Sequence, residues 1–363
     1  MTDRPKVQCC YSADELMDEI VAMSASIKNE TFFSFTKMKD DPEVSEMVNK
    51  AISFQKNLSL KPRNPELRHL SGFELIEKLM VCNGYRIKQD WRGVWEHDDR
   101  KDFYEIACPG VKKNADCVVA ICLKDNLLNK LNRRPISFLR TKTFGKAFKL
   151  SETEPFFSQP VAKGRMSTGF LVQPDLIATA AHCIHGVDVT ELRFVFDYKI
   201  TNPHKVVHAE QVPTENIYNG VKVVDSNYNV KITSDWALVK LDREVKNRPI
   251  ATISKSEVIC GHPVYVLGHP CGLPLKYAAG AQVSEVQTAC FVADLDVFAG
   301  NSGSPVFHQH THEVLGIVVQ GDSRNFMLTP KGWITVVFPN SEFHSNKSRC
   351  TRSSEFARFC CPN

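Results

Sequence analysis

A serine set between two glycines is the residue of this sequence whose surroundings suggest chemistry most directly. It is Ser302, in the hexapeptide G-N-S-G-S-P at residues 300–305. A serine hydroxyl is a useful nucleophile only when it is exposed, oriented and given a base. The glycines permit a sharp turn in which the backbone N–H groups of Gly300 and Ser302 point at one spot, as an oxyanion hole for acyl transfer requires. Surface turns have a similar composition, so the hexapeptide alone leaves that second interpretation open.

A candidate base for this serine is His182, in the pentapeptide T-A-A-H-C at residues 179–183. The pentapeptide follows an apolar stretch at residues 169–172 and a turn at 173–175. The small residues before His182 allow tight packing behind an imidazole that faces a cleft. A lone histidine is more often structural than catalytic, but this pentapeptide is much less common than a lone histidine.

A carboxylate that could orient the imidazole is Asp235, near the start of S-D-W-A-L-V-K-L at residues 234–241. Apolar residues alternate after it, which predicts a strand with Asp235 at its end, where the carboxylate could hold the Nδ1–H of His182. An aspartate at a strand start is ordinary by itself. The three residues follow each other as His182, Asp235 and Ser302, which is the chain order of chymotrypsin and differs from that of subtilisin and the α/β-hydrolases.

Together these motifs resemble the trypsin-like peptidase family over about residues 150–340, through its T-A-A-H-C, D-x-A-L-x-x-L and G-D/N-S-G-G/S-P sequences. The similarity is greater to bacterial, glutamyl-endopeptidase-like members, which share G-N-S-G-S-P-V-F and the L-G-H-P at residues 267–270. The resemblance implies two six-stranded β-barrels with a triad of His182, Asp235 and Ser302 in the cleft between them. It also implies hydrolysis of peptide bonds through an acyl-enzyme, with Gly300 and Ser302 forming the oxyanion hole.

Two departures from the animal digestive members of this family have physical meaning. Those enzymes have an aspartate before the nucleophile, which pairs with an α-amino group released by cleavage, whereas this chain has Asn301. We therefore expect the site to assemble without removal of the N-terminal region. The family often pairs the cysteine at Cys183 with one on the preceding strand, but no cysteine lies between Cys122 and Cys183. A reducing compartment would explain the missing partner.

The resemblance also suggests a specificity pocket, though less firmly. It places Asp296 near the floor of the S1 pocket, where an aspartate would favour Lys or Arg in the substrate. In the alternative, Asp296 is a structural residue held by backbone N–H groups, and the pocket is apolar or small. Glutamyl endopeptidases use a histidine at the position of Val318, so a Glu preference is disfavoured. The expected wall consists of Val319, Gln320 and Gly321.

The secondary structure expected around these motifs differs between residues 1–140 and residues 141–363. Residues 1–140 predict a smaller α+β domain of unknown role, with helices after Ser12, over about 42–55 and after Ser71, and a buried strand at 117–123. Residues 141–363 predict the all-β double-barrel domain, because short strands alternate with Pro, Gly and Asn turns. A C-terminal extension is expected from about residue 340.

Composition excludes some classes of function. The net charge of +4 over 363 residues gives no reason to expect a nucleic-acid partner, and no window is long and apolar enough to span a membrane. The N-terminus has no signal-peptide pattern, so a cytoplasmic or other reducing location is expected, with unconventional export left open. The 13 cysteines lack zinc-site spacing. No metal or cofactor is expected, since the alternating histidines His308, His310 and His312 predict a solvated hairpin rather than a metal site.

Three functions remain for comparison with the structure. The first is a serine endopeptidase that acts on protein or peptide substrates inside a cell. The second is a catalytically silent, protease-like binding module; the presence of all three triad residues argues against it. In the third, residues 1–140 bind a protein partner as an adaptor, and proteolysis switches this activity.

Overall fold

The computed structural model describes residues 94–95, 98–128, 136–164, 166–204, 210–321, 326–329, 332–335, 337–338 and 347–360. The three helices expected before residue 90 lie outside these residues. The chain divides into two compact units, Met1–Asp90 with Phe326–Ile334 and Trp91–Asn325 with Thr335–Asn363. Strands β19 (Phe326–Thr329) and β20 (Gly332–Thr335) pair with each other. Everything described below lies in the second unit.

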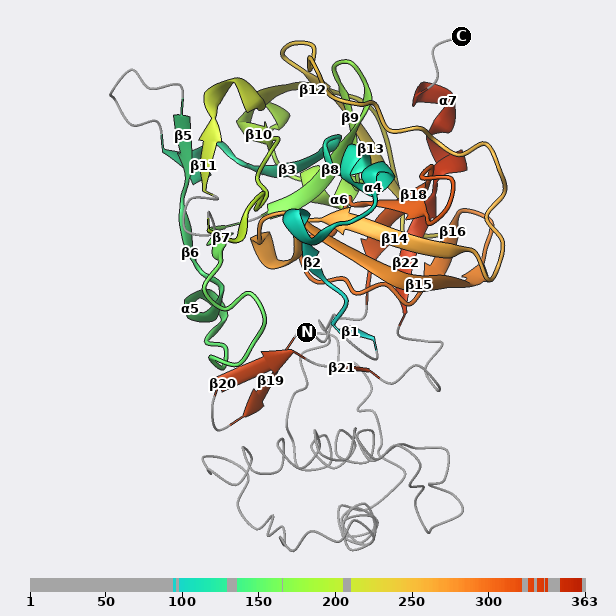
Figure 1. Ribbon diagram of the computed structural model, residues 1–363. Coiled ribbons are helices and arrows are strands. Elements are labelled where there is room, and N and C mark those ends of the chain that lie inside the picture. Colours follow the sequence, from blue (N-terminus) through green and yellow to red (C-terminus); the bar gives the residue numbers. More distant parts are fainter. Residues whose placement is uncertain are drawn as a thin grey trace, which may run out of the picture. The chain divides into compact units, whose positions relative to one another are not determined.

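The first barrel of this unit is a closed ring of six antiparallel strands in the order β10, β12, β13, β9, β8 and β3 (Figure 1). Strands β3 and β9 are almost entirely buried and consist of apolar residues apart from Thr179 at the end of β9, because one face fills the barrel and the other is covered by neighbouring elements. The six strands are β3 (Val118–Leu123), β8 (Met166–Gln173), β9 (Leu176–Thr179), β10 (Leu192–Val195), β12 (Ile217–Asn229) and β13 (Ser234–Leu241).

The second barrel also has six strands, in the order β14, β17, β18, β22, β16 and β15, and the pairing of β14 with β15 closes it. Strand β2 (Lys101–Asp102) adds to it through β15. The six strands are β14 (Pro263–Gly268), β15 (Lys276–Val286), β16 (Cys290–Ala293), β17 (Pro305–His308), β18 (Val314–Gln320) and β22 (Ser348–Arg352). The predicted pair of six-stranded barrels is confirmed.

The limits of the barrel domain differ from those expected at residues 141 and 340. Strand β3 lies well before residue 141, yet it pairs with both β8 and β10 and completes the first barrel. Strand β22 lies after residue 340, yet it pairs with β16 and β18 and completes the second. The cause is the same at both ends: pairing partners distant in sequence complete each ring. The middle of the domain is identified in the sequence by short strands that alternate with turns. This pattern is absent around β3, which follows a helix.

The remaining elements are short and lie outside the two rings. Strand β1 (Val94–Trp95) pairs in parallel with β21 (Val337–Phe338), β6 (Thr141–Thr143) pairs with β7 (Pro160–Ala162), and β4 (Leu127–Leu128), β5 (Ile136–Leu139) and β11 (Gln211–Pro213) form a sheet. The α-helices are α4 (Pro109–Ala115), α5 (Phe144–Phe148), α6 (Ala181–Ile184) and α7 (Ala357–Cys360). The 3-10 turns are η1 (Phe103–Glu105), η2 (Lys124–Asn126), η3 (Val189–Glu191), η5 (Thr214–Asn216), η6 (Pro270–Gly272) and η7 (Ser353–Glu355).

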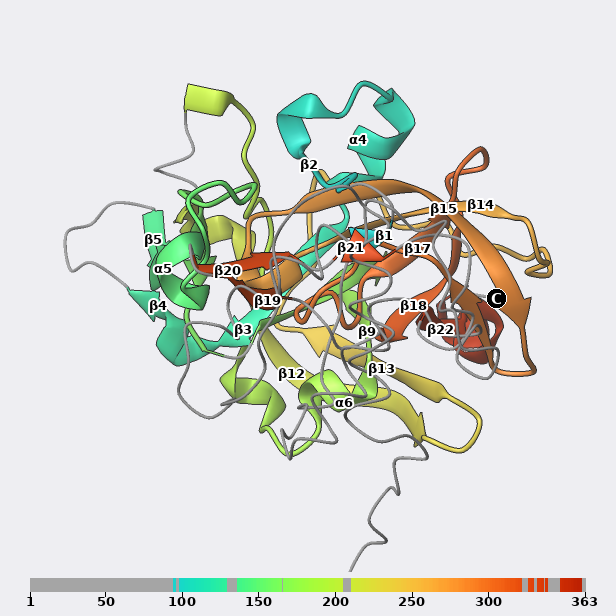
Figure 2. The same ribbon diagram turned by 90° about the horizontal axis from the view of Figure 1, so that it is seen from below.

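A single apolar cluster joins the two barrels. It includes the buried rings of Phe170 and Phe194 from the first barrel and of Tyr265 and Phe307 from the second. A second cluster fills the interior around β14, β16 and β18. The short helix α6 lies against β12 and β13 (Figure 2), so the residues at the end of β9 and the start of β13 are brought together.

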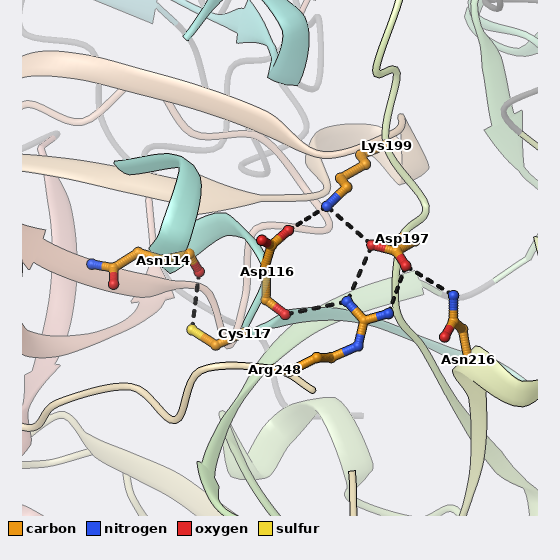
Figure 3. A network of polar contacts seen from close by, with 7 residues as sticks. All are labelled: Asn114, Asp116, Cys117, Asp197, Lys199, Asn216 and Arg248. Carbon is orange, nitrogen blue, oxygen red and sulfur yellow. Dashed lines mark hydrogen bonds and ion pairs between the residues drawn. The ribbon is translucent and has the colours of Figure 1, made fainter. Parts of the chain in front are cut away.

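A polar network fixes the entry of the chain into the first barrel (Figure 3). The Asp197 carboxylate accepts hydrogen bonds from Arg248 at 2.5 Å and Asn216 at 2.8 Å, and pairs with Lys199 at 3.0 Å. Lys199 also pairs with Asp116, which directly precedes the β3 region. Burial opposes the charge on Asp197, but these cations outweigh it and lower its pKa to about 2. The network thus ties the segment before β3 to the residues that follow β10, to the start of β12 and to the stretch that follows β13.

Candidate active site

Asp235 holds His182 through two hydrogen bonds, one to the imidazole and one to the backbone. The Asp235 carboxylate accepts one from His182 Nδ1 at 2.5 Å and another from the His182 backbone N–H at 3.1 Å. An ionised carboxylate can only accept, so the ring proton is on Nδ1 and Nε2 is the nitrogen that can take a proton. The His182 side chain is 30% exposed and that of Asp235 only 9%, so a substrate can reach the imidazole but not the carboxylate.

The local sequence explains this geometry. Strand β9 ends at Thr179, and α6 turns the chain immediately, so the imidazole lies beside the first residues of β13. Ala180 and Ala181 are buried behind it, as their small side chains allow. Asp235 is the second residue of β13, where the sequence placed it.

Asp235 is itself fixed from the second barrel. Its backbone N–H donates to the Thr351 hydroxyl at 3.0 Å, and that hydroxyl donates to the Thr233 carbonyl at 3.1 Å. Thr351 belongs to β22 and is fully buried. Next to it, the Ser234 hydroxyl donates to Glu355 at 2.7 Å. The last strand of the second barrel therefore orients the carboxylate that orients His182.

The turn that carries Ser302 needs its two glycines. Gly300 has φ of +99° and Gly303 of +87°, a region that residues with a Cβ rarely adopt. A Cβ on Gly300 would lie 2.4 Å from the His269 carbonyl oxygen, and one on Gly303 only 2.0 Å from the Thr168 carbonyl oxygen. Inside the turn, Asn301 N–H donates to the Phe298 carbonyl at 3.0 Å. The turn is therefore tightly packed rather than a loose surface turn.

Thr168, on β8, connects this turn to the histidine motif. Its backbone N–H donates to the Ser302 carbonyl at 3.0 Å, and its hydroxyl donates to the Gly300 carbonyl at 2.9 Å. Its own carbonyl accepts from the Thr179 hydroxyl at 2.7 Å, and Thr179 opens T-A-A-H-C. The His182 and Ser302 motifs are thus joined through one buried residue.

Burial and hydrogen bonding shift the pKa values of two histidines in opposite directions. Burial disfavours the charged form of His182, but the hydrogen bond to Asp235 and the Cys183 sulfur, 3.8 Å from Nε2, together raise its pKa above the usual value. His269 is fully buried, and desolvation lowers its pKa to about 3. His269 therefore stays neutral and structural; its backbone N–H donates to the Thr168 hydroxyl at 3.1 Å.

The residues expected in the specificity pocket differ from one another in burial and in partners. The buried Asp296 carboxylate accepts the Asp99 backbone N–H at 3.1 Å, which matches the second of the two alternatives drawn from the sequence. On β18, Val319 packs into the core cluster, whereas Gln320 is exposed and Gly321 follows the end of the strand. The structure therefore gives Asp296 an internal partner, and the wall formed by Val319, Gln320 and Gly321 stays a prediction.

No metal centre is found among the described residues. His308 packs edge-on against His262 at 5.0 Å and against His310 at 5.7 Å, while His312 hydrogen-bonds the Tyr265 hydroxyl at 3.0 Å. In the described part of the chain, no helix is both long and apolar enough to cross a membrane.

Sequence reasoning did not identify the residues that hold the candidate triad residues in place. Thr168, Thr351 and Cys271, whose backbone N–H donates to the Ala299 carbonyl at 2.5 Å, were not singled out. For Thr351 no local signal existed, since it lies in a segment expected to be an extension. For Thr168 the only signal was its place on the strand before the histidine motif.

Comparisons with known proteins give one family match and several distant solved structures. Residues 167–317 match the family described as the trypsin-like peptidase domain. No curated protein matches the sequence. Similar solved structures include a Glu endopeptidase (15% identity, 73% of this chain and 98% of that chain, TM-score 0.44) and the active form of the Rv3671c protease from M. tuberculosis (15%, 76% and 89%, 0.41). Another is the VesB protease of Vibrio cholerae (13%, 72% and 65%, 0.41).

These structures are too distant to transfer a function, and the assignment depends on the family match together with the two barrels. The match extends from β8 into β18 and includes all three candidate triad positions. The chain therefore contains a trypsin-like peptidase domain, the domain of serine endopeptidases.

Proposed function

We propose that this chain is an active serine endopeptidase with His182, Asp235 and Ser302 as its catalytic triad. The observation that carries the proposal is the double hydrogen bond from His182 to Asp235. This pair fixes the ring orientation and the tautomer that a general base needs. Its connection to the Ser302 turn through Thr168 supports the same assignment.

In the proposed reaction, His182 Nε2 takes the proton from Ser302 Oγ as that oxygen attacks the carbonyl carbon of the scissile bond. The backbone N–H groups of Gly300 and Ser302 stabilise the resulting oxyanion. The imidazolium, stabilised by Asp235, then protonates the leaving amine and leaves an acyl-enzyme on Ser302. A water molecule repeats the sequence, releases the carboxylic acid and regenerates the serine.

We further propose that the substrates are proteins in a reducing compartment. Seven of the described cysteines, Cys183 among them, are free thiols, as is usual for proteins kept in such a compartment. We propose separately that the region before the barrels binds a protein partner. Fusing residues 1–90 to a tag and testing for a partner in pull-downs would examine it.

For the specificity pocket, we propose that Asp296 does not select Lys or Arg, because its carboxylate already accepts the Asp99 N–H. Matched peptides with Arg, Leu, Ala or Glu at the scissile position test this through kcat/KM. A strong Arg preference that disappears in Asp296→Ser would restore the first alternative, a basic specificity.

The experiment that separates an enzyme from a silent binding module compares the purified chain with its Ser302→Ala form on a peptide library. The wild type should cleave peptides, and Ser302→Ala should lose on the order of 10⁶ in kcat. Equal turnover by the two forms, or none by a folded wild type, contradicts the proposed function.

A further inference from the structure

The segment at residues 98–102, which precedes the first barrel, lies against the loop that carries the nucleophile. We define that loop as residues 296–302. We infer that Arg100, held in this segment, is a positioning residue that keeps the nucleophile loop in its working conformation. The inference depends on the proposed function, because it concerns the presentation of Ser302.

The segment is anchored at its C-terminal end by a buried ion pair. The Asp102 carboxylate pairs with Lys276 of β15 at 2.5 Å and accepts a hydrogen bond from Gln159 at 2.6 Å. Lys276 also donates to the Gln159 side-chain oxygen at 2.8 Å. Both charged side chains are almost fully buried, and β2 pairs with β15 at the same place. The segment therefore has one fixed path along the second barrel.

Arg100 projects from this segment into the protein. Its guanidinium makes a two-pronged pair with Asp98, from Nε and Nη2, at 2.7 Å each. The guanidinium carbon lies 4.2 Å from the centre of the Phe298 ring and 5.3 Å from that of Phe156. The negative face of an aromatic ring attracts a cation that lies over it, and the attraction is stronger where water is excluded. Arg100 thus binds Phe298, the third residue of the nucleophile loop.

A second contact reaches the same loop from the same segment. The Asp99 backbone N–H donates to Asp296 at 3.1 Å, at the start of the loop. Farther along, Gly300 has no room for a side chain, and the Cys271 N–H holds the Ala299 carbonyl. Contacts at Asp296, Phe298 and Ala299 leave the loop little freedom before it reaches Ser302.

The burial of Arg100 is hard to explain by stability. Its Nη1 is buried with no hydrogen-bond partner among the described residues. A buried ion pair is often no more stabilising than apolar residues of the same volume, and an unsatisfied donor makes it worse. We therefore attribute the buried charge of Arg100 to the position that it gives the nucleophile loop. Arg100 contacts Phe298 in the uncut chain, so this positioning needs no cleavage of the chain.

The test compares Arg100→Met with Lys101→Met, a matched change that removes an exposed cation from the neighbouring position. Both proteins, with the wild type, are examined for kcat and KM on one peptide, for the rate of labelling by a fluorophosphonate, and for thermal unfolding. We expect Arg100→Met to lose at least about tenfold in kcat and in labelling rate, since small misplacements of reacting groups cost that much or more. Its KM should stay within about twofold, and Lys101→Met should match the wild type.

Two further variants keep the test decisive. Arg100→Lys retains a charge over Phe298 without the fork to Asp98, so its kcat should be intermediate. Asp98→Asn keeps the shape of the segment and should lower kcat several-fold. It replaces Arg100→Met in the test if Arg100→Met does not fold.

The outcomes separate the two proposals. An inactive wild type contradicts the proposed function. An active wild type with unchanged kcat and labelling in folded Arg100→Met, or in Asp98→Asn where Arg100→Met does not fold, overturns the role of Arg100. So does a loss of activity that only follows the loss of folded protein.

Discussion

Replacing Thr351 by valine tests whether the last strand of the second barrel supports the catalytic pair. Valine has almost the same shape, so the change removes only the hydroxyl. That hydroxyl accepts the Asp235 N–H at 3.0 Å and donates to the Thr233 carbonyl at 3.1 Å, in a place with no solvent exposure. Each buried group left unpaired costs about 1–3 kcal/mol, so the loss of both partners should lower the free energy of unfolding by about 2–6 kcal/mol.

The activity should fall as well, because the Asp235 backbone carries the carboxylate that orients His182. We expect kcat to decrease about tenfold, less than the loss from changing Asp235 itself. Urea unfolding followed by fluorescence gives the stability, and peptide hydrolysis at a temperature where both proteins are folded gives kcat. Thr351→Ser is the control, since it keeps the hydroxyl and loses one methyl group, about 1 kcal/mol. A valine variant as stable and active as the wild type would refute this reasoning.

Three further predictions concern the site itself. His182→Ala should cost about as much kcat as Ser302→Ala, on the order of 10⁶, and Asp235→Asn about 10⁴-fold; near-normal turnover of either variant on the same peptide contradicts its role. Burial opposes the charge on His182, but the hydrogen bond to Asp235 and the nearby Cys183 sulfur outweigh it and raise its pKa to about 10. The fraction of neutral base, and hence kcat/KM, should therefore rise with pH with a midpoint well above the ordinary value of about 6.5. In Asp235→Asn that midpoint should move to lower pH; an unchanged midpoint in a rate profile that extends to about pH 11 argues against His182 as the base. Gly303→Ala would place a Cβ 2.0 Å from the Thr168 carbonyl oxygen, so we expect loss of labelling by a fluorophosphonate and a lower melting temperature, and a fully labelled variant would contradict the packing of the turn.

The motifs of the proposed triad were readable from sequence because each is short and each depends on its immediate neighbours. Gly300 and Gly303 identify a turn that only glycine can form, and the alternation after Asp235 identifies a strand. Their chain order then limited the fold to one family of double barrels. The barrels followed from that resemblance, and the structure and the family match agree with them.

Features that depend on distant pairing could not be read in the same way. Strand β3 looked like part of an N-terminal domain, because its partners β8 and β10 lie more than forty residues later. Strand β22 lies beyond the part of the chain that resembled the family, yet it supplies Thr351 to Asp235. The partner of Asp296 is likewise remote, since Asp99 lies 197 residues before it. No local pattern records such contacts.

The most direct test of the account is to find where a fluorophosphonate attaches to the full-length, uncut chain. Peptide mapping by mass spectrometry should find the adduct on Ser302, with the intact mass showing no cleavage before labelling. Labelling should disappear in His182→Ala, because only an assembled serine–histidine pair reacts quickly. An adduct on another residue, or labelling that begins only after the chain has been cut, would contradict the central claim.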